Sequence, residues 1–226
     1  MPGRFSTGDS GASHSWAGRL SALGLAAALA LAPAVASEEQ PPAEEPPTWS
    51  FSGAAYNYVI PGDEDFLMPI AYADRGKLRL EARYNYEERA ATSLWAGWRF
   101  AFGDEVSLEL IPMLGGVFGE LSGVAPGLEL SLGWKSLSFY MESEYLFDLT
   151  DEDGSFYYAW SELAWEPLEW LRVGAVGQRT RVVHTDLEIQ RGLLAGVSWR
   201  RVQLTSYFFN PGGDDEFTVF SLSFSP

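Results

Sequence analysis

The chain contains no cysteine among its 226 residues. Disulfides therefore cannot stabilise a small core, and no lipid can be attached through an amino-terminal cysteine. Positive charge is also scarce, because 15 Lys and Arg stand against 31 Asp and Glu, a formal net charge of −16. A surface this acidic repels phosphate backbones, so nucleic acid is excluded as an expected partner.

Long hydrophobic runs are absent except for one near the amino terminus, at residues 20–31. Arg4 and Arg19 precede this run and small residues at 34–36 follow it, which is the order found in a secretory signal peptide. The run is shorter than the roughly 20 apolar residues that a spanning helix needs. We expect residues 1–36 to be a signal peptide, with an uncleaved anchor as the alternative.

The next segment, residues 37–47, consists mainly of Pro and Glu and has almost nothing apolar to bury. Such a composition predicts a disordered or extended tether. The remainder, residues 48–226, has the usual length of one domain. We expect no second domain.

What the chain does contain is a regular alternation of apolar and polar residues between Lys77 and Phe224, with Glu or Arg recurring in the polar phase. In the segment 78–86 the odd residues would face a polar side and the even residues an apolar side, because strand side chains point alternately to opposite faces. No segment after Thr48 has a helical period. We expect twelve strands, with ten or fourteen as alternatives. They span residues 48–58, 67–73, 77–86, 92–101, 105–113, 125–134, 136–147, 155–165, 169–180, 187–199, 201–209 and 216–224.

The connections between these segments alternate between tight turns and mostly longer links that are richer in Gly or acid. An up-and-down meander produces this pattern because successive connections fall on opposite rims of the sheet. Outer-membrane barrels pair short periplasmic turns with longer external loops. The expected fold is therefore all-β, an up-and-down antiparallel transmembrane β-barrel of about 12 strands. A secreted soluble β-sandwich that binds a ligand is the alternative.

Aromatic residues border the tight turns, which favours the barrel because Trp and Tyr prefer the interface between hydrocarbon and water. The residues at the short-turn rim are Trp98, Phe100, Phe102, Trp134, Trp165, Trp170 and Trp199. A second girdle is expected at the other rim from Tyr56, Tyr58, Tyr84, Tyr86, Tyr145, Phe147, Phe156, Tyr157, Phe208 and Phe209. In a sandwich the same residues would be core aromatics.

The last segment, 216–224, alternates and ends in Phe224, with Ser225 and Pro226 after it. It resembles the carboxy-terminal signal of bacterial outer-membrane β-barrels, and the segment 73–87 is similar to segments of uncharacterised bacterial proteins. The chain thus resembles an uncharacterised family of bacterial outer-membrane β-barrels. That resemblance implies export to the outer membrane, contact with membrane lipid and lipopolysaccharide, and insertion by barrel-assembly machinery. It implies no activity.

If the apolar phase faces lipid, the polar phase lines the lumen. The predicted lumen-lining residues are Arg79, Glu81, Arg83, Arg99, Glu109, Glu129, Glu142, Glu144, Glu162, Arg172 and Glu188. Carboxylates exceed cations in this set, so some need water, a metal ion or protonation. The set predicts a narrow or gated, cation-favouring passage for small solutes or ions. The alternative is an internal salt-bridge network that fills a structural envelope barrel, since about twelve strands permit either.

An outer-membrane lipid-modifying hydrolase is a further alternative, based on His184 and Asp186 in a predicted external loop. No Gly-x-Ser-x-Gly motif is present, and we predict no catalytic residue. Acidic loops at 62–65, 151–154 and 213–216 would suit calcium, which could link the rim to lipopolysaccharide phosphates. No other cofactor is expected. The glycine-rich segment 115–119 is predicted to lie in the longest loop and to fold inward as a constriction.

Overall fold

Strands and tight turns make up almost all of the chain that the computed structural model describes, which is residues 46–119, 121–183 and 187–226. The strands are β1 (Ser50–Val59), β2 (Phe66–Arg75), β3 (Leu78–Tyr84), β4 (Thr92–Trp98), β5 (Phe100–Phe102), β6 (Val106–Phe118), β7 (Gly123–Trp134), β8 (Leu137–Asp148), β9 (Phe156–Leu168), β10 (Leu171–Val182), β11 (Glu188–Trp199), β12 (Val202–Phe209) and β13 (Phe217–Phe224). A 3-10 turn, η1 (Glu152–Gly154), precedes β9. Within the described ranges, no helix has the length and apolarity to cross a membrane.

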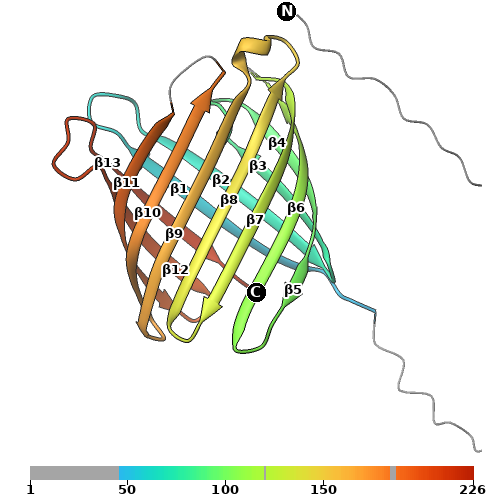
Figure 1. Ribbon diagram of the computed structural model, residues 1–226, viewed down its shortest axis with the longest axis vertical. Coiled ribbons are helices and arrows are strands. Elements are labelled where there is room, and N and C mark those ends of the chain that lie inside the picture. The colour runs from blue at the N-terminus through green and yellow to red at the C-terminus, as the bar shows by residue number, and fades with distance from the viewer. Residues whose placement is uncertain (1–45, 120, 184–186) are drawn as a thin grey trace, which may run out of the picture. The chain divides into compact units, whose positions relative to one another are not determined.

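The strands close into an antiparallel barrel (Figure 1). Neighbours in the chain pair with each other, and the first and last strands pair as well, with Tyr56 opposite Ser221. The short β5 continues β4, since both pair with β6, so the thirteen segments occupy twelve positions around the wall. The predicted all-β, up-and-down barrel of 12 strands is confirmed, and the β-sandwich alternative is wrong.

The two ends of the barrel differ as the turn pattern predicts. Short turns and the carboxyl terminus lie at one end, and most of the longer loops, including η1, lie at the other (Figure 1). Lys135 and Arg200 adopt φ of 54° and 56° in two of the short turns, which lets the chain reverse within two residues. We refer to the two ends as the turn end and the loop end.

The segment 115–119 corrects one prediction. Four of its residues belong to β6, which runs to Phe118, and they do not form a long loop. Gly115 faces the ring of Trp95, and a Cβ at that position would collide with it. Gly127 of β7 also lies against this ring, where a Cβ would come within 2.9 Å. The glycines therefore leave room for an inward-facing Trp rather than supplying a flexible constriction.

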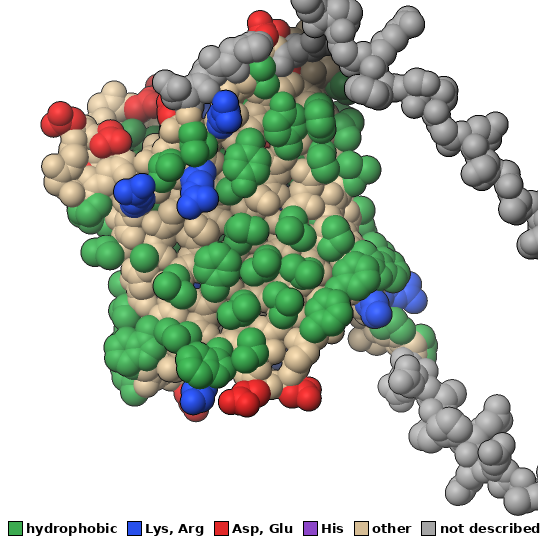
Figure 2. Space-filling view, in the orientation of Figure 1, with side chains coloured by type: hydrophobic (Ala, Val, Ile, Leu, Met, Phe, Trp, Pro, Cys, Tyr) green, Lys and Arg blue, Asp and Glu red, His purple; other side chains and the backbone are tan. Residues whose placement is uncertain are grey.

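The outside of the barrel is apolar. Outward residues such as Leu114, Leu163, Leu193 and Leu222 are more than half exposed, whereas an aqueous protein would cover most of them. Figure 2 shows hydrophobic side chains spread across the face, with charged ones mostly toward its edges. Around the turn end Trp98, Trp134, Trp165, Trp170 and Trp199 are all exposed, which forms the predicted first girdle. The surface is that of a membrane-spanning barrel.

The second predicted girdle is half wrong. Five of its residues point outward: Tyr84, Tyr145, Phe147, Tyr157 and Phe208. The other five point inward. Those inward residues are Tyr56, Tyr58, Tyr86, Phe156 and Phe209, which lie in or against the two apolar clusters inside the barrel. The two-residue period sends neighbours such as Phe208 and Phe209 to opposite faces, whereas Tyr86 turns inward because it lies beyond the end of β3.

Candidate functional site in the barrel lumen

A buried arginine organises the charged side of the lumen. Arg83 of β3, with a side chain only 2% exposed, pairs with three carboxylates from β3 and β8. Its Nη2 lies 2.8 Å from Oε2 of Glu81, and its Nη1 lies 2.7 Å from Oε1 of Glu142 and 3.2 Å from Oε2 of Glu144. Three negative groups around one cation leave this cluster with an excess of negative charge.

Two aromatic rings enclose the Arg83 guanidinium. Its Cζ lies 4.4 Å from the ring centre of Tyr86 and 4.5 Å from that of Trp95, both within cation–π range. The Tyr86 hydroxyl donates to Oε1 of Glu142 at 2.7 Å, and Nε1 of Trp95 donates to Oγ of Ser93 at 2.9 Å. The rings therefore separate the arginine from water, and Tyr86 also holds Glu142 in place.

Glu87, in the connection after β3, adds a carboxylate at the loop-end border of this cluster. Its Oε1 accepts from Oγ of Ser93 at 2.5 Å and from Nε1 of Trp95 at 3.2 Å. Burial raises the pKa of the Glu87 carboxyl above its ordinary value, although these two hydrogen bonds act in the opposite direction.

A second ionic cluster lies closer to the turn end. Arg79 pairs with Asp74 at 3.0 Å and with Glu129 at 2.6 Å. Arg99 pairs with the same Asp74 at 3.0 Å and with Glu109 at 3.0 Å. The network thus links β2, β3, β6 and β7 across the start of the lumen.

The facing wall, formed by β9, β10 and β12, has a smaller polar group centred on Glu162. Arg172 donates to Oε2 of Glu162 at 2.7 Å, while Nε1 of Trp160 and the hydroxyl of Tyr207 donate to Oε1 at 2.9 and 2.8 Å. Both carboxylate oxygens are therefore engaged. Buried groups of this kind are tolerated only when they are hydrogen-bonded.

Between the two walls is a vestibule of about 260 Å³ at the turn end. Its charged lining is Arg79, Glu129, Glu162 and Arg172, so each wall contributes one cation and one anion. Farther in, a cavity of only about 20 Å³ shares Tyr56 and Tyr140 with the vestibule. A cavity this small holds about one water molecule. The lumen therefore narrows sharply at these tyrosines.

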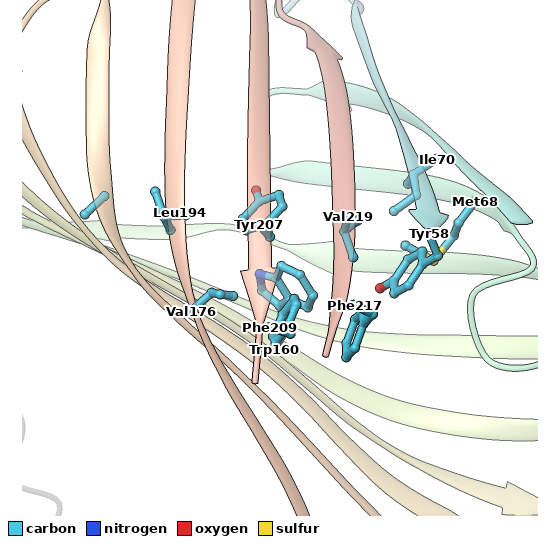
Figure 3. Close-up of a cluster of buried hydrophobic side chains, with 11 residues drawn as sticks. Tyr58, Met68, Ile70, Trp160, Val176, Leu194, Tyr207, Phe209, Phe217 and Val219 are labelled. Atoms are coloured by element: carbon cyan, nitrogen blue, oxygen red, sulfur yellow. The ribbon is translucent and has the colours of Figure 1, made fainter. Parts of the chain in front are cut away.

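Beyond the constriction, aromatic rings fill one side of the loop end (Figure 3). Tyr58 stacks on Phe66 and Phe209 stacks on Phe217, each pair with ring centres 4.6 Å apart. Tyr58 and Phe217 are 6.3 Å apart, and Trp160 meets Phe209 edge-on at 5.4 Å. We call these five residues the aromatic stack. It fills this side of the lumen with packed side chains.

The predicted lumen residues are distributed as follows. Ten of the eleven take part in the ion pairs just described, and Glu188 is instead exposed at the start of β11. Sequence reasoning missed Asp74, because it was assigned to a turn, and it missed the inward tyrosines. The sequence did contain a signal for each. Asp74 is an even-numbered residue of β2, like the inward Tyr72, and Tyr140 is an even-numbered residue of β8, like the inward Glu142.

Other predicted sites remain untested. His184 and Asp186 lie outside the described residues, as do the predicted signal peptide and most of the predicted tether. In the part of the chain that is described, no group of three or more His, Cys, Asp or Glu could hold a metal ion. Calcium at the acidic rim stays a prediction.

Comparisons with known proteins identify the fold. No protein-family model matches the chain, and no curated protein matches its sequence. Among solved structures, the KdgM porin matches with a TM-score of 0.54 and 13% identity, over 77% of this chain and 99% of that one. A KdgM porin in complex with disordered oligogalacturonate matches with a TM-score of 0.54 and 12% identity, over 77% of this chain and 99% of that one. The NanC porin gives a TM-score of 0.56 and 7% identity, over 76% of this chain and 98% of that one. The fold is that of these outer-membrane porins, and the apolar exterior of the barrel suits a lipid environment.

Proposed function

We propose that the protein is a narrow, cation-favouring passage for small solutes or ions across the outer membrane. The vestibule is the observation that carries this proposal, because a barrel with a merely structural role has no need of a 260 Å³ polar hollow in its interior. Four arginines and seven carboxylates form the inward ion pairs. A lumen with this negative excess attracts cations and repels anions.

The proposed passage is gated. The space beside Tyr56 and Tyr140 admits about one water, so a hydrated ion passes only when side chains move. Tyr86 and Tyr158 line the same space and contact each other edge-on, with ring centres 5.6 Å apart. Rotation of these rings would open the route.

The charge excess also argues against one substrate class. One KdgM structure is described in complex with oligogalacturonate, which is an acidic saccharide. Beyond the vestibule, where the charges balance, a polyanion would meet the three carboxylates around Arg83, which are Glu81, Glu142 and Glu144. Neutral or cationic small solutes are the better fit here.

The test is single-channel recording of the refolded protein in planar bilayers, with a KCl gradient to measure ion preference. Wild-type protein should give small, cation-selective steps, and Tyr158→Ala should enlarge them. Glu129→Gln should move the reversal potential toward zero, because it removes a vestibule charge. Asp214→Asn removes an exposed carboxylate from the connection between β12 and β13 and should leave the reversal potential unchanged.

A structural envelope barrel is the second candidate, favoured by the packed aromatic stack at the loop end. It is distinguished by the same recordings. If neither wild type nor Tyr158→Ala conducts, while both keep the heat-modifiable gel migration of a closed barrel, the passage is refuted and the structural role stands.

A further inference from the structure

Three arginines depart from the apolar character of the outer wall. Arg179 and Arg181 of β10 and Arg191 of β11 are exposed near the loop end. Two residues apart on one strand, the first two point the same way and lie about 7 Å from each other. Arg179 is opposite Ile189, so Arg191 is its diagonal neighbour, at about 7–8 Å. We call the three residues the arginine patch.

The patch points away from the lumen. Arg172 and Val176 of β10 face inward, which sends the odd residues of that strand outward. Leu194 of β11 is buried inside, and Arg191 therefore faces out. Figure 2 shows basic side chains gathered toward the loop end of this face, with hydrophobic side chains below them. The whole chain carries a net charge of −16, which makes a cluster of bare cations on its outer face a local exception.

A hollow adjoins the arginine patch. It has a volume of about 540 Å³ and is lined by Tyr145, Tyr157, Arg181, Val182, Val183 and Leu187. Tyr145 is opposite Tyr157, and Tyr157 is opposite Arg181, so two rings and a guanidinium form one row across β8, β9 and β10. Beside that row Ala159 faces outward yet is only 6% exposed, because larger neighbours rise around it. The volume is in the range of small-molecule sites.

The patch has no acidic partner within the described ranges. The ion pairs found there involve other basic residues, five arginines in the lumen and loops. Glu188 is a near neighbour in sequence but lies on the inward phase of β11. An arginine on the lipid face is disfavoured at the membrane midplane and tolerated at the interface. An unpaired cluster at the loop end therefore lies at headgroup depth, where its counter-charge must come from outside the protein.

We propose that the arginine patch and the adjoining hollow bind the phosphorylated headgroup of an outer-leaflet lipid, which in this membrane is lipopolysaccharide. Guanidinium groups bind phosphate oxygens in pairs, and three of them match a headgroup with more than one phosphate. Tyr145 and Tyr157 present amphipathic rings that suit the sugar and interface region. The acyl chains would lie against the apolar wall below, where Leu163 and Leu193 are exposed. Because the remaining loops are rich in acid, this patch is where direct contact with phosphate is favourable.

The test measures lipid A binding to the full-length refolded protein in detergent by native mass spectrometry. The triple variant Arg179→Gln, Arg181→Gln, Arg191→Gln should bind roughly 100-fold more weakly, from about fivefold for each arginine near a membrane surface. The matched control is Arg75→Gln, Arg200→Gln, Arg201→Gln, which removes the same charge from exposed residues at the turn end. It should bind like wild type. Replacing the patch with three lysines keeps the charge but loses the paired hydrogen bonds, so it should restore only part of the binding.

Two further arms identify the ligand. Lipid A without its phosphates should bind the wild type as weakly as phosphorylated lipid A binds the patch variant. Inorganic phosphate at matched phosphorus concentration should not displace bound lipid A. The proposal is overturned if the patch variant binds normally while its barrel still shows heat-modifiable migration, if the control loses as much, if dephosphorylated lipid A binds equally, or if free phosphate competes. None of these readouts depends on conductance.

Discussion

The two halves of the lumen follow the same strand alternation but have opposite chemistry. On the side of β3 and β8, the inward residues Arg83, Glu142 and Glu144 form a buried ionic cluster. On the side of β12 and β13, the inward residues Phe209, Phe217 and Val219 form packed apolar contacts. An inward position in this barrel is therefore not polar by rule.

The difference shows that one half of the lumen mainly stabilises the barrel, whereas the other half leaves the polar space through which solutes would pass. Apolar rings fill space without needing hydrogen-bond partners, so the aromatic stack stabilises its side of the loop end. Buried charges are stable only in mutual contact, and they leave polar space where that contact network ends at the vestibule. Changing one half should therefore alter a different property from changing the other.

Breaking the charged half should have the largest effect on stability. Arg83→Leu leaves Glu81, Glu142 and Glu144 buried without their shared cation, and removing one partner of a buried pair costs about 3–5 kcal/mol. Urea titration followed by gel mobility of the folded form should show the loss. Combining it with Glu142→Leu should recover part of the stability. A single variant as stable as wild type would mean that water, not Arg83, solvates these carboxylates.

Disrupting the aromatic half should lower the stability slightly less, and it should also change the conductance. Phe209 is fully buried, and Phe209→Ala removes a ring from the stack at roughly 3 kcal/mol. We expect larger conductance steps with unchanged ion preference. Phe208→Ala, one residue away but 41% exposed on the lipid side, is the control for both measurements. Equal effects of the two variants would contradict the inward assignment.

The smallest expected effect is a pH dependence of stability that arises from Glu87, at the loop-end border of the charged half. Burial raises the pKa of Glu87, so its contribution to stability is fully present below the ordinary Glu range and is lost as pH rises through the raised value. The free energy of unfolding, measured by urea titration across this window, should therefore fall with rising pH in the wild type, by less than about 1.4 kcal/mol per pH unit. Glu87→Gln should flatten that slope. An unchanged slope would assign the pH dependence to other groups.

Particular residues show how far sequence reasoning extended. The phase of Glu81, Arg83 and Glu129 was predictable because alternation assigns a face without knowledge of partners. Alternation within 115–119 is masked by glycines, so the end of β6 was missed. Phe208 and Phe209 were both assigned to a girdle, because their composition suits either face. The register sends one to lipid and the other into the stack.

The sequence by itself determined the barrel, its turn and loop ends and the face of most lumen charges, since these depend on period and on local turn chemistry. Only the tertiary structure decided which charges meet, that Asp74 links Arg79 to Arg99, and that Arg179, Arg181 and Arg191 gather on one patch. It also decided that aromatic rings fill half of the lumen. The reason is that strand stagger and closure set neighbours across the wall, and these come from parts of the chain far apart in sequence.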